Sequence, residues 1–135
     1  MVKKQSTSRQ EIENLLGIVA RDRSEADRDD LHPDIRFQLL YNAGLQLATI
    51  VLRLNDLRIG HAGHHRETFR ATHDLVHEDL RPIIAHFDQA RRKRNSLVYD
   101  QAGTATEADL RGLRASVGTF EEWVRGLANT RFSGV

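Results

Sequence analysis

One stretch of this 135-residue chain decides its fold class: PDIRFQLLYNAGLQLATIVLRLNDLR, from Pro33 to Arg58. Its apolar residues recur at alternating spacings of three and four, which is the pattern of one buried helix face. The repeat runs through Leu40, Ala43, Leu47, Ile50, Leu54 and Leu57. A proline suits the first turn of a helix, and Gly60 follows where a C-terminal glycine is common. The stretch predicts a long amphipathic helix over residues 33–58.

The remaining segments predict further helices and no strand. We expect helices over residues 8–26, 66–76, 79–99 and 105–128, the second of them short. Ser8 with Glu11, and Thr104 with Glu107, match the capping-box pattern that begins a helix. The prediction is an all-α, four- to five-helix up-and-down bundle that forms a single domain over residues 1–135. We expect residues 1–7 and 129–135 to be frayed.

The composition narrows the function classes. The chain has no cysteine, which excludes disulfides, thiol nucleophiles and thiolate metal sites. No apolar run approaches the roughly 20 residues that cross a bilayer, and no signal peptide is recognisable. The formal net charge of +1 argues against general polyanion binding, although Arg91–Arg94 is a block of four cations. We expect a cytoplasmic protein that needs no membrane and no cofactor.

The segment Ala90–Asp100 places a charge where a helix core is expected. The apolar spacing that leads to Ala90 continues to Arg94 and then to Leu97. A buried guanidinium without a partner costs on the order of several kcal/mol. Arg94 therefore needs a carboxylate, backbone carbonyls, a second subunit or an anionic ligand. The candidate carboxylates for a purely structural role are Asp34, Asp56 and Asp100.

Seven histidines suggest a metal site, but their pattern is weak. His73 and His77 stand four residues apart, which would place both on one helix face. His61, His64 and His65 cluster just upstream. The H-E-x-x-H pattern of zinc hydrolases is absent, and so are the serine elbow and the Walker phosphate loop. We therefore expect no metal ligands.

Two segments together resemble HEPN domains, which are compact α-helical bundles. The run Arg94-Asn95-Ser96-Leu97-Val98-Tyr99 resembles their signature near the end of a bundle helix. Asp34–Ala48 resembles the long second helix of a bacterial subgroup in which a Gly-His-His segment follows, here Gly63-His64-His65. The similarity covers residues 31–100. It implies a homodimer, a small nucleotidyltransferase as an associated partner, and a role in toxin–antitoxin or defence systems.

The resemblance also implies RNA chemistry, from which this chain departs at one position. Many HEPN proteins are metal-independent endoribonucleases that use an arginine and, a few residues later, a histidine. Here Tyr99 stands in place of that histidine, and a phenol that titrates near pH 10 is a poor general base. His64 or His65 could replace it if the fold brings either one near Arg94.

Three hypotheses follow. The favoured one is a non-catalytic HEPN-like module that binds a nucleotide, RNA or a partner protein. Its binding residues would be Arg91, Arg94, Asn95, Tyr99, His64 and His65. The first alternative is a metal-independent endoribonuclease with a variant Arg-x4-Tyr site, in which Arg94, Asn95 and Tyr99 are catalytic. The second alternative is a helical interaction protein with a purely structural Arg94.

Overall fold

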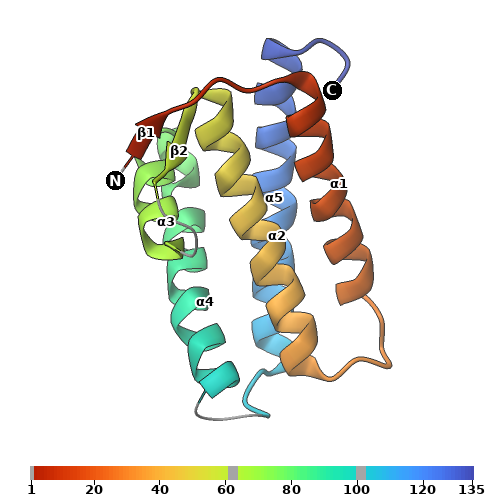
Figure 1. Cartoon of the computed structure of the whole chain (residues 1–135). Coiled ribbons are helices and arrows are strands. Elements are labelled where there is room, and N and C mark those ends of the chain that lie inside the picture. The colour runs from red at the N-terminus through yellow and green to blue at the C-terminus, as the bar shows by residue number, and fades with distance from the viewer. Residues whose placement is uncertain (1, 61–63, 100–102) are drawn as a thin grey trace.

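The computed structural model describes residues 2–60, 64–99 and 103–135, including all of their side chains except those of residues 98 and 99 (Figure 1). Within these residues the chain is an α-helical bundle with one small sheet, which confirms the predicted all-α class. The elements are β1 (Val2–Lys4), α1 (Arg9–Ala26), α2 (Pro33–Leu54), β2 (Leu57–Ile59), α3 (His65–His73), the 3-10 turn η1 (Glu78–Leu80), α4 (Arg81–Tyr99) and α5 (Glu107–Arg131). The long helices α1, α2, α4 and α5 alternate in direction, and α3 packs against α2 and α4 (Figure 1).

Helix starts follow local capping chemistry. The Ser8 hydroxyl accepts a hydrogen bond from the Glu11 backbone N–H at 3.2 Å, as predicted for the start of α1. The cap of α5 was predicted wrongly, because Thr106 and Asp109 form the capping box instead of Thr104 and Glu107. The physical reason lies in α2. The Asp34 carboxylate accepts the backbone N–H groups of Gly103 and Ala105, which holds this segment in a turn and delays the helix.

The end of α2 differs from the prediction. The helix stops at Leu54 rather than continuing to Arg58, and Gly60 is not its cap. Asp56 turns the chain with a φ of 58°, in the left-handed region that Asp adopts more readily than most residues. Leu57–Ile59 then pair antiparallel with Val2–Lys4. The prediction of no strand was therefore wrong, because a three-residue strand is too short to show alternation and its partner is distant in sequence.

Both chain ends contact the rest of the protein, although residues 1–7 and 129–135 were predicted to be frayed. Val2–Lys4 belong to the small sheet, and the Gln5 backbone N–H donates to the Asp56 carbonyl at 2.8 Å. At the other end α5 continues to Arg131, whose guanidinium donates to the Leu54 carbonyl at 2.8 Å. Phe132 and Val135 then pack against the core. Both ends thereby fix the turn after α2.

The core lies between α2 and the helices around it. The predicted stripe of α2 is buried from Leu40 to Leu54, and the corresponding stripe of α5 is buried from Leu110 to Val124. On α4, Ile84 is buried and Ile83 is only partly buried. Phe87 of α4 lies directly against Gly44 of α2. The small residues of α2 thus allow α4 to approach closely.

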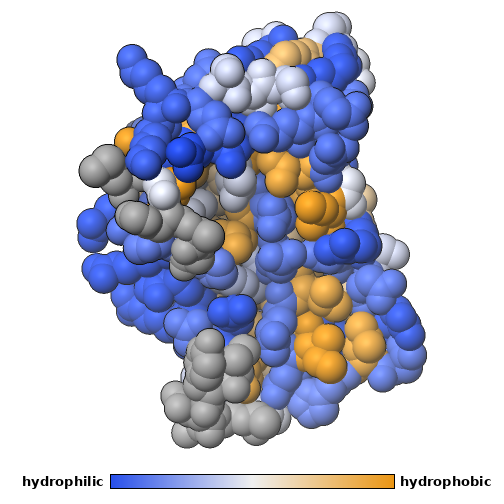
Figure 2. Space-filling view, viewed as in Figure 1, coloured by the Kyte–Doolittle hydropathy of each residue, from blue (hydrophilic) through white to orange (hydrophobic). Residues whose placement is uncertain are grey.

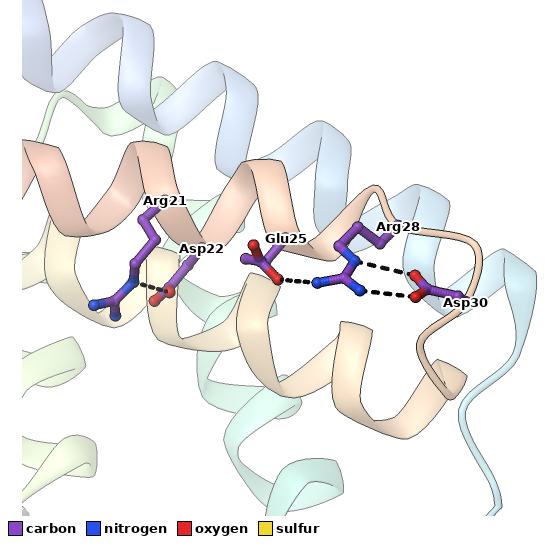
Figure 3. A network of polar contacts seen from close by, with 5 residues as sticks. All are labelled: Arg21, Asp22, Glu25, Arg28 and Asp30. Atoms are coloured by element: carbon purple, nitrogen blue, oxygen red, sulfur yellow. Dashed lines mark hydrogen bonds and ion pairs between the residues drawn. The ribbon is translucent and has the colours of Figure 1, made fainter.

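The connector between α1 and α2 is polar, as its sequence suggests. The Arg28 guanidinium donates to Asp30 through two nitrogens and to Glu25 through the third (Figure 3). Its hydrogen bonds to Asp30 lower the pKa of that carboxyl. Arg36 of α2 also contacts the end of α1, where its Nε donates to the Ala26 carbonyl at 2.7 Å. These contacts set the α1–α2 hairpin.

The surface is uneven in polarity. Hydrophilic side chains cover the middle of α4, whereas apolar side chains gather over the first half of α2 (Figure 2). Ile35 in that half of α2 is 48% exposed. Across the described ranges, none of the helices is both long and apolar enough to span a membrane.

Candidate anion-binding site

Five of the six predicted binding residues gather around one open pocket of about 590 Å³. The pocket lies where the start of α3 meets the last turns of α4, and we call it the Arg94 pocket. Its lining residues are His64, His65, Arg66, Glu67, Arg91, Arg94 and Asn95. The sixth predicted residue is Tyr99, whose side chain lies outside the described part of the chain. The pairing of α3 with α4 therefore joins the two predicted segments.

Arg94 is held at the pocket wall by neutral groups. Its side chain is half-buried, and its guanidinium carbon lies 5.9 Å from the centre of the Tyr41 ring. Its Nη1 also donates a long 3.4 Å hydrogen bond to the Asn95 side-chain oxygen. A cation over an aromatic face gains roughly 0.5–1 kcal/mol where water still reaches it. Tyr41 thus supports Arg94 without neutralising its charge.

Two of the three carboxylates proposed as structural partners of Arg94 are engaged elsewhere. Asp34 holds the turn before α5, and Asp56 pairs with Arg131 at 2.9 Å. Asp100 lies outside the described residues. No carboxylate of the described residues lies within 4.0 Å of the Arg94 guanidinium. The positive charge of Arg94 is therefore open to a ligand in the pocket.

Tyr41 fixes the hydrogen-bonding state of His65. The Tyr41 hydroxyl lies 2.9 Å from His65 Nδ1, and the Tyr41 side chain is only 2% exposed. Burial raises the pKa of Tyr41 above its usual value, so the phenol stays protonated. Among the described residues the phenol has no other hydrogen-bond acceptor. It therefore donates to Nδ1, and neutral His65 carries its own proton on Nε2.

His65 is uncharged at neutral pH. Burial lowers the pKa of His65, and the positive charges of Arg94 and Arg91 lower it further. The neutral ring accepts at Nδ1 and donates from Nε2. His65 thus offers the pocket a hydrogen-bond donor instead of a proton-accepting nitrogen.

The remaining lining residues give the pocket an excess of positive charge. Arg66, Arg91 and Arg94 contribute three cations, against the one carboxylate of Glu67. Glu67 lies 3.4 Å from His64 Nδ1, and Arg91 Nε donates to Asp88 at 3.0 Å. Guanidinium groups and other N–H donors around an open cavity can donate hydrogen bonds to the oxygens of a phosphate or a carboxylate.

The sequence reasoning missed three members of this site. Arg66 and Glu67 directly follow the predicted His64-His65 pair. They line the pocket because α3 starts at His65. Tyr41 lies within the helix predicted over residues 33–58, and a buried phenol needs a hydrogen-bond partner. Its partner is 24 residues away on another helix, which no local pattern reveals.

His73 and His77 do not lie on one helix face, as a metal site formed by these two residues would require. α3 ends at His73, and His77 lies before η1, where its Nδ1 accepts the Asp79 backbone N–H. In the part of the chain that the structure covers, no group of three His, Asp or Glu side chains is placed to hold a metal ion.

In comparisons with known proteins, the chain matches no protein-family model, no curated protein and no solved structure.

Proposed function

We propose that the Arg94 pocket binds the phosphate group of a nucleotide or RNA and leaves the phosphodiester intact. One observation carries this proposal: Arg94 and His65 line the same pocket, and the Tyr41 hydroxyl lies 2.9 Å from His65 Nδ1. Hydrogen bonds to charged groups contribute about 1.5–3 kcal/mol each. A few such bonds account for specific binding of one phosphate.

The resemblance to HEPN domains supports the same ligand class. It is carried by the segment around Arg94 and by the His64-His65 pair, and these two segments line one pocket. On this basis we propose a non-catalytic HEPN-like module of a toxin–antitoxin or defence system.

A metal-independent endoribonuclease is the second candidate, because two histidines line the pocket together with Arg94. In such a reaction His64 would take the proton of the 2′-hydroxyl while O2′ bonds to phosphorus and the P–O5′ bond breaks. The leaving O5′ must then receive a proton, for which a protonated His65 is the second histidine available in the pocket. The lowered pKa of His65 makes that form scarce at neutral pH. A pocket with little protonated His65 favours binding over cleavage.

Titration of the protein with uridine 5′-monophosphate tests the proposal by calorimetry. We expect wild type to bind and Arg94→Met to bind at least about tenfold more weakly, the effect of one lost charged contact. The matched control is Arg114→Met on α5, where Arg114 pairs with Asp27 at 3.0 Å, and its affinity should not change. Equal affinity in wild type and Arg94→Met would overturn the proposal.

The same proteins separate binding from cleavage. A fluorescent oligouridylate incubated in chelator at pH 5 and pH 7 should stay intact with wild type. Cleavage that disappears in Arg94→Met would establish the endoribonuclease instead.

The resemblance also supports two partners, a second copy of the chain and a small nucleotidyltransferase. We propose the homodimer as the form in which the module acts. Light scattering at micromolar protein should give twice the mass of one chain, 15.4 kDa. A single-chain mass under these conditions would contradict it.

A further inference from the structure

A second pocket adjoins the Arg94 pocket along the same two helices. It has a volume of about 290 Å³, and Arg66 lines both pockets. Its floor is apolar, formed by Phe69 of α3 and Ile84 of α4, and its rim carries the exposed Arg70 and Arg92. We call it the Arg70 pocket. The shared arginine makes the two pockets neighbours in one groove between α3 and α4.

The groove is long enough for several nucleotides. The early residues of α3 face the late residues of α4 in the Arg94 pocket, and the order reverses in the Arg70 pocket, so the helices are antiparallel. From Ile84 to Arg94, α4 rises by 1.5 Å per residue, which gives about 15 Å. A stacked strand advances 3.4 Å per nucleotide, so about four nucleotides fit this length.

The groove carries an excess of positive charge. Five arginines line it (Arg66, Arg70, Arg91, Arg92 and Arg94) against three carboxylates (Glu67, Asp74 and Asp88). Asp88 is already engaged by Arg91 at 3.0 Å and lies 3.8 Å from Arg92. The chain as a whole has a formal net charge of only +1, so this groove is a local concentration of positive charge.

We propose that the two pockets form one binding groove for a single-stranded nucleic acid of about four nucleotides. One phosphate lies at Arg94, the following phosphates lie along Arg66, Arg70 and Arg92, and a base contacts the apolar floor. Two packed helices have axes about 8–10 Å apart, so the groove between them admits one strand and not a duplex. This inference rests on the proposed function and specifies its ligand.

A length series tests the groove separately from the Arg94 pocket. Calorimetry would compare uridine 5′-monophosphate with oligouridylates of two, four, six and eight nucleotides. We expect affinity for wild type to rise about tenfold or more up to four nucleotides and then to level off. Oligothymidylates of the same lengths show whether the strand must be RNA. A hairpin with an eight-base-pair duplex stem should bind no better than the monophosphate.

The decisive variant is Arg70→Ala with Arg92→Ala. It should bind the monophosphate as wild type does but lose the gain with length, so that the tetranucleotide binds like the monophosphate. The salt dependence of tetranucleotide binding should weaken by about 1.4 in log–log slope, which corresponds to two phosphate contacts. The control is Arg111→Ala with Arg125→Ala on α5, which removes the same charge from two exposed positions outside the groove.

The outcomes separate the two proposals. Loss of monophosphate binding in Arg94→Met together with length-independent affinity in wild type would overturn the groove and keep the proposed function. Equal effects of the two double variants on the tetranucleotide would also overturn the groove, because net charge would then explain the binding. Failure of the wild type to bind any of these ligands would overturn both proposals.

Discussion

At the scale of single residues, the site depends on Tyr41, His65 and Arg94, which come from α2, α3 and α4. The phenol donates to His65 Nδ1, and its ring supports the Arg94 guanidinium. Arg94 in turn lowers the pKa of His65 by charge repulsion, after the larger effect of burial. One buried tyrosine thus determines the protonation site of the histidine and the position of the arginine.

This arrangement predicts the titration of His65. NMR of the imidazole should show a pKa below the usual value of about 6.5 in wild type. Arg94→Met should raise the pKa of His65, because it removes a positive charge that opposes the imidazolium form. Arg114→Met on α5 should leave the pKa unchanged. A pKa in Arg94→Met at or below the wild-type value would show that Arg94 does not act on His65.

At the scale of helices, the close approach of α2 and α4 depends on Gly44. A Cβ atom at this position would collide with the Phe87 ring, which is fully buried. Phe87 cannot move aside freely, because it also packs against Phe69 and Phe120 at ring-centre distances of 6.0 and 5.9 Å. The position of α4, and with it that of Arg94, is set by this contact.

Gly44→Ala should therefore destabilise the protein despite the higher helix propensity of alanine. We expect a loss of about 1–3 kcal/mol in the free energy of unfolding, the usual cost of overpacking. Gly17→Ala in α1 is the matched control, since nothing lies within 4 Å of the added Cβ. It should stabilise by about 0.5–1 kcal/mol. Urea denaturation measures both variants, and a Gly44→Ala protein as stable as wild type would refute this packing argument.

At the scale of the whole molecule, stability depends on pH through groups whose pKa changes on folding. His65 has a lower pKa in the folded protein than in the unfolded chain. Between these two values the unfolded chain binds more protons, so acidification through this window destabilises the fold. Asp109 acts at lower pH, because the Thr106 backbone N–H lowers the pKa of its carboxyl. Its stabilisation is present above pH 4 or so and is lost as the pH falls.

The contribution of His65 can be isolated with His65→Gln, which cannot titrate. The free energy of unfolding of wild type should fall from pH 7 toward the folded-state pKa of His65, and that of His65→Gln should fall less over the same range. Urea denaturation at a series of pH values gives both curves. Parallel curves for the two proteins would show that His65 does not lose its proton on folding.

Much of the fold could be predicted, because its signals are local. The three-four spacing from Leu40 to Leu54 placed the core stripe of α2, and Ser8 placed the start of α1. Both signals lie within a few turns of one helix. The predictions of element boundaries were wrong where segments that are distant in the sequence contact each other. Asp34 moves the start of α5, and Val2–Lys4 pair with the segment after α2.

The sequence by itself determined an all-α bundle, because helical periodicity is written in neighbouring positions. Its resemblance to HEPN domains pointed to the two segments that carry the candidate site. Only the tertiary structure decided that His65 lies in the same pocket as Arg94, that Tyr41 fixes its proton, and that Arg66 joins two pockets. These relations depend on how α2, α3 and α4 pack together. Their packing is set by contacts such as that of Gly44 with Phe87, between residues far apart in the chain.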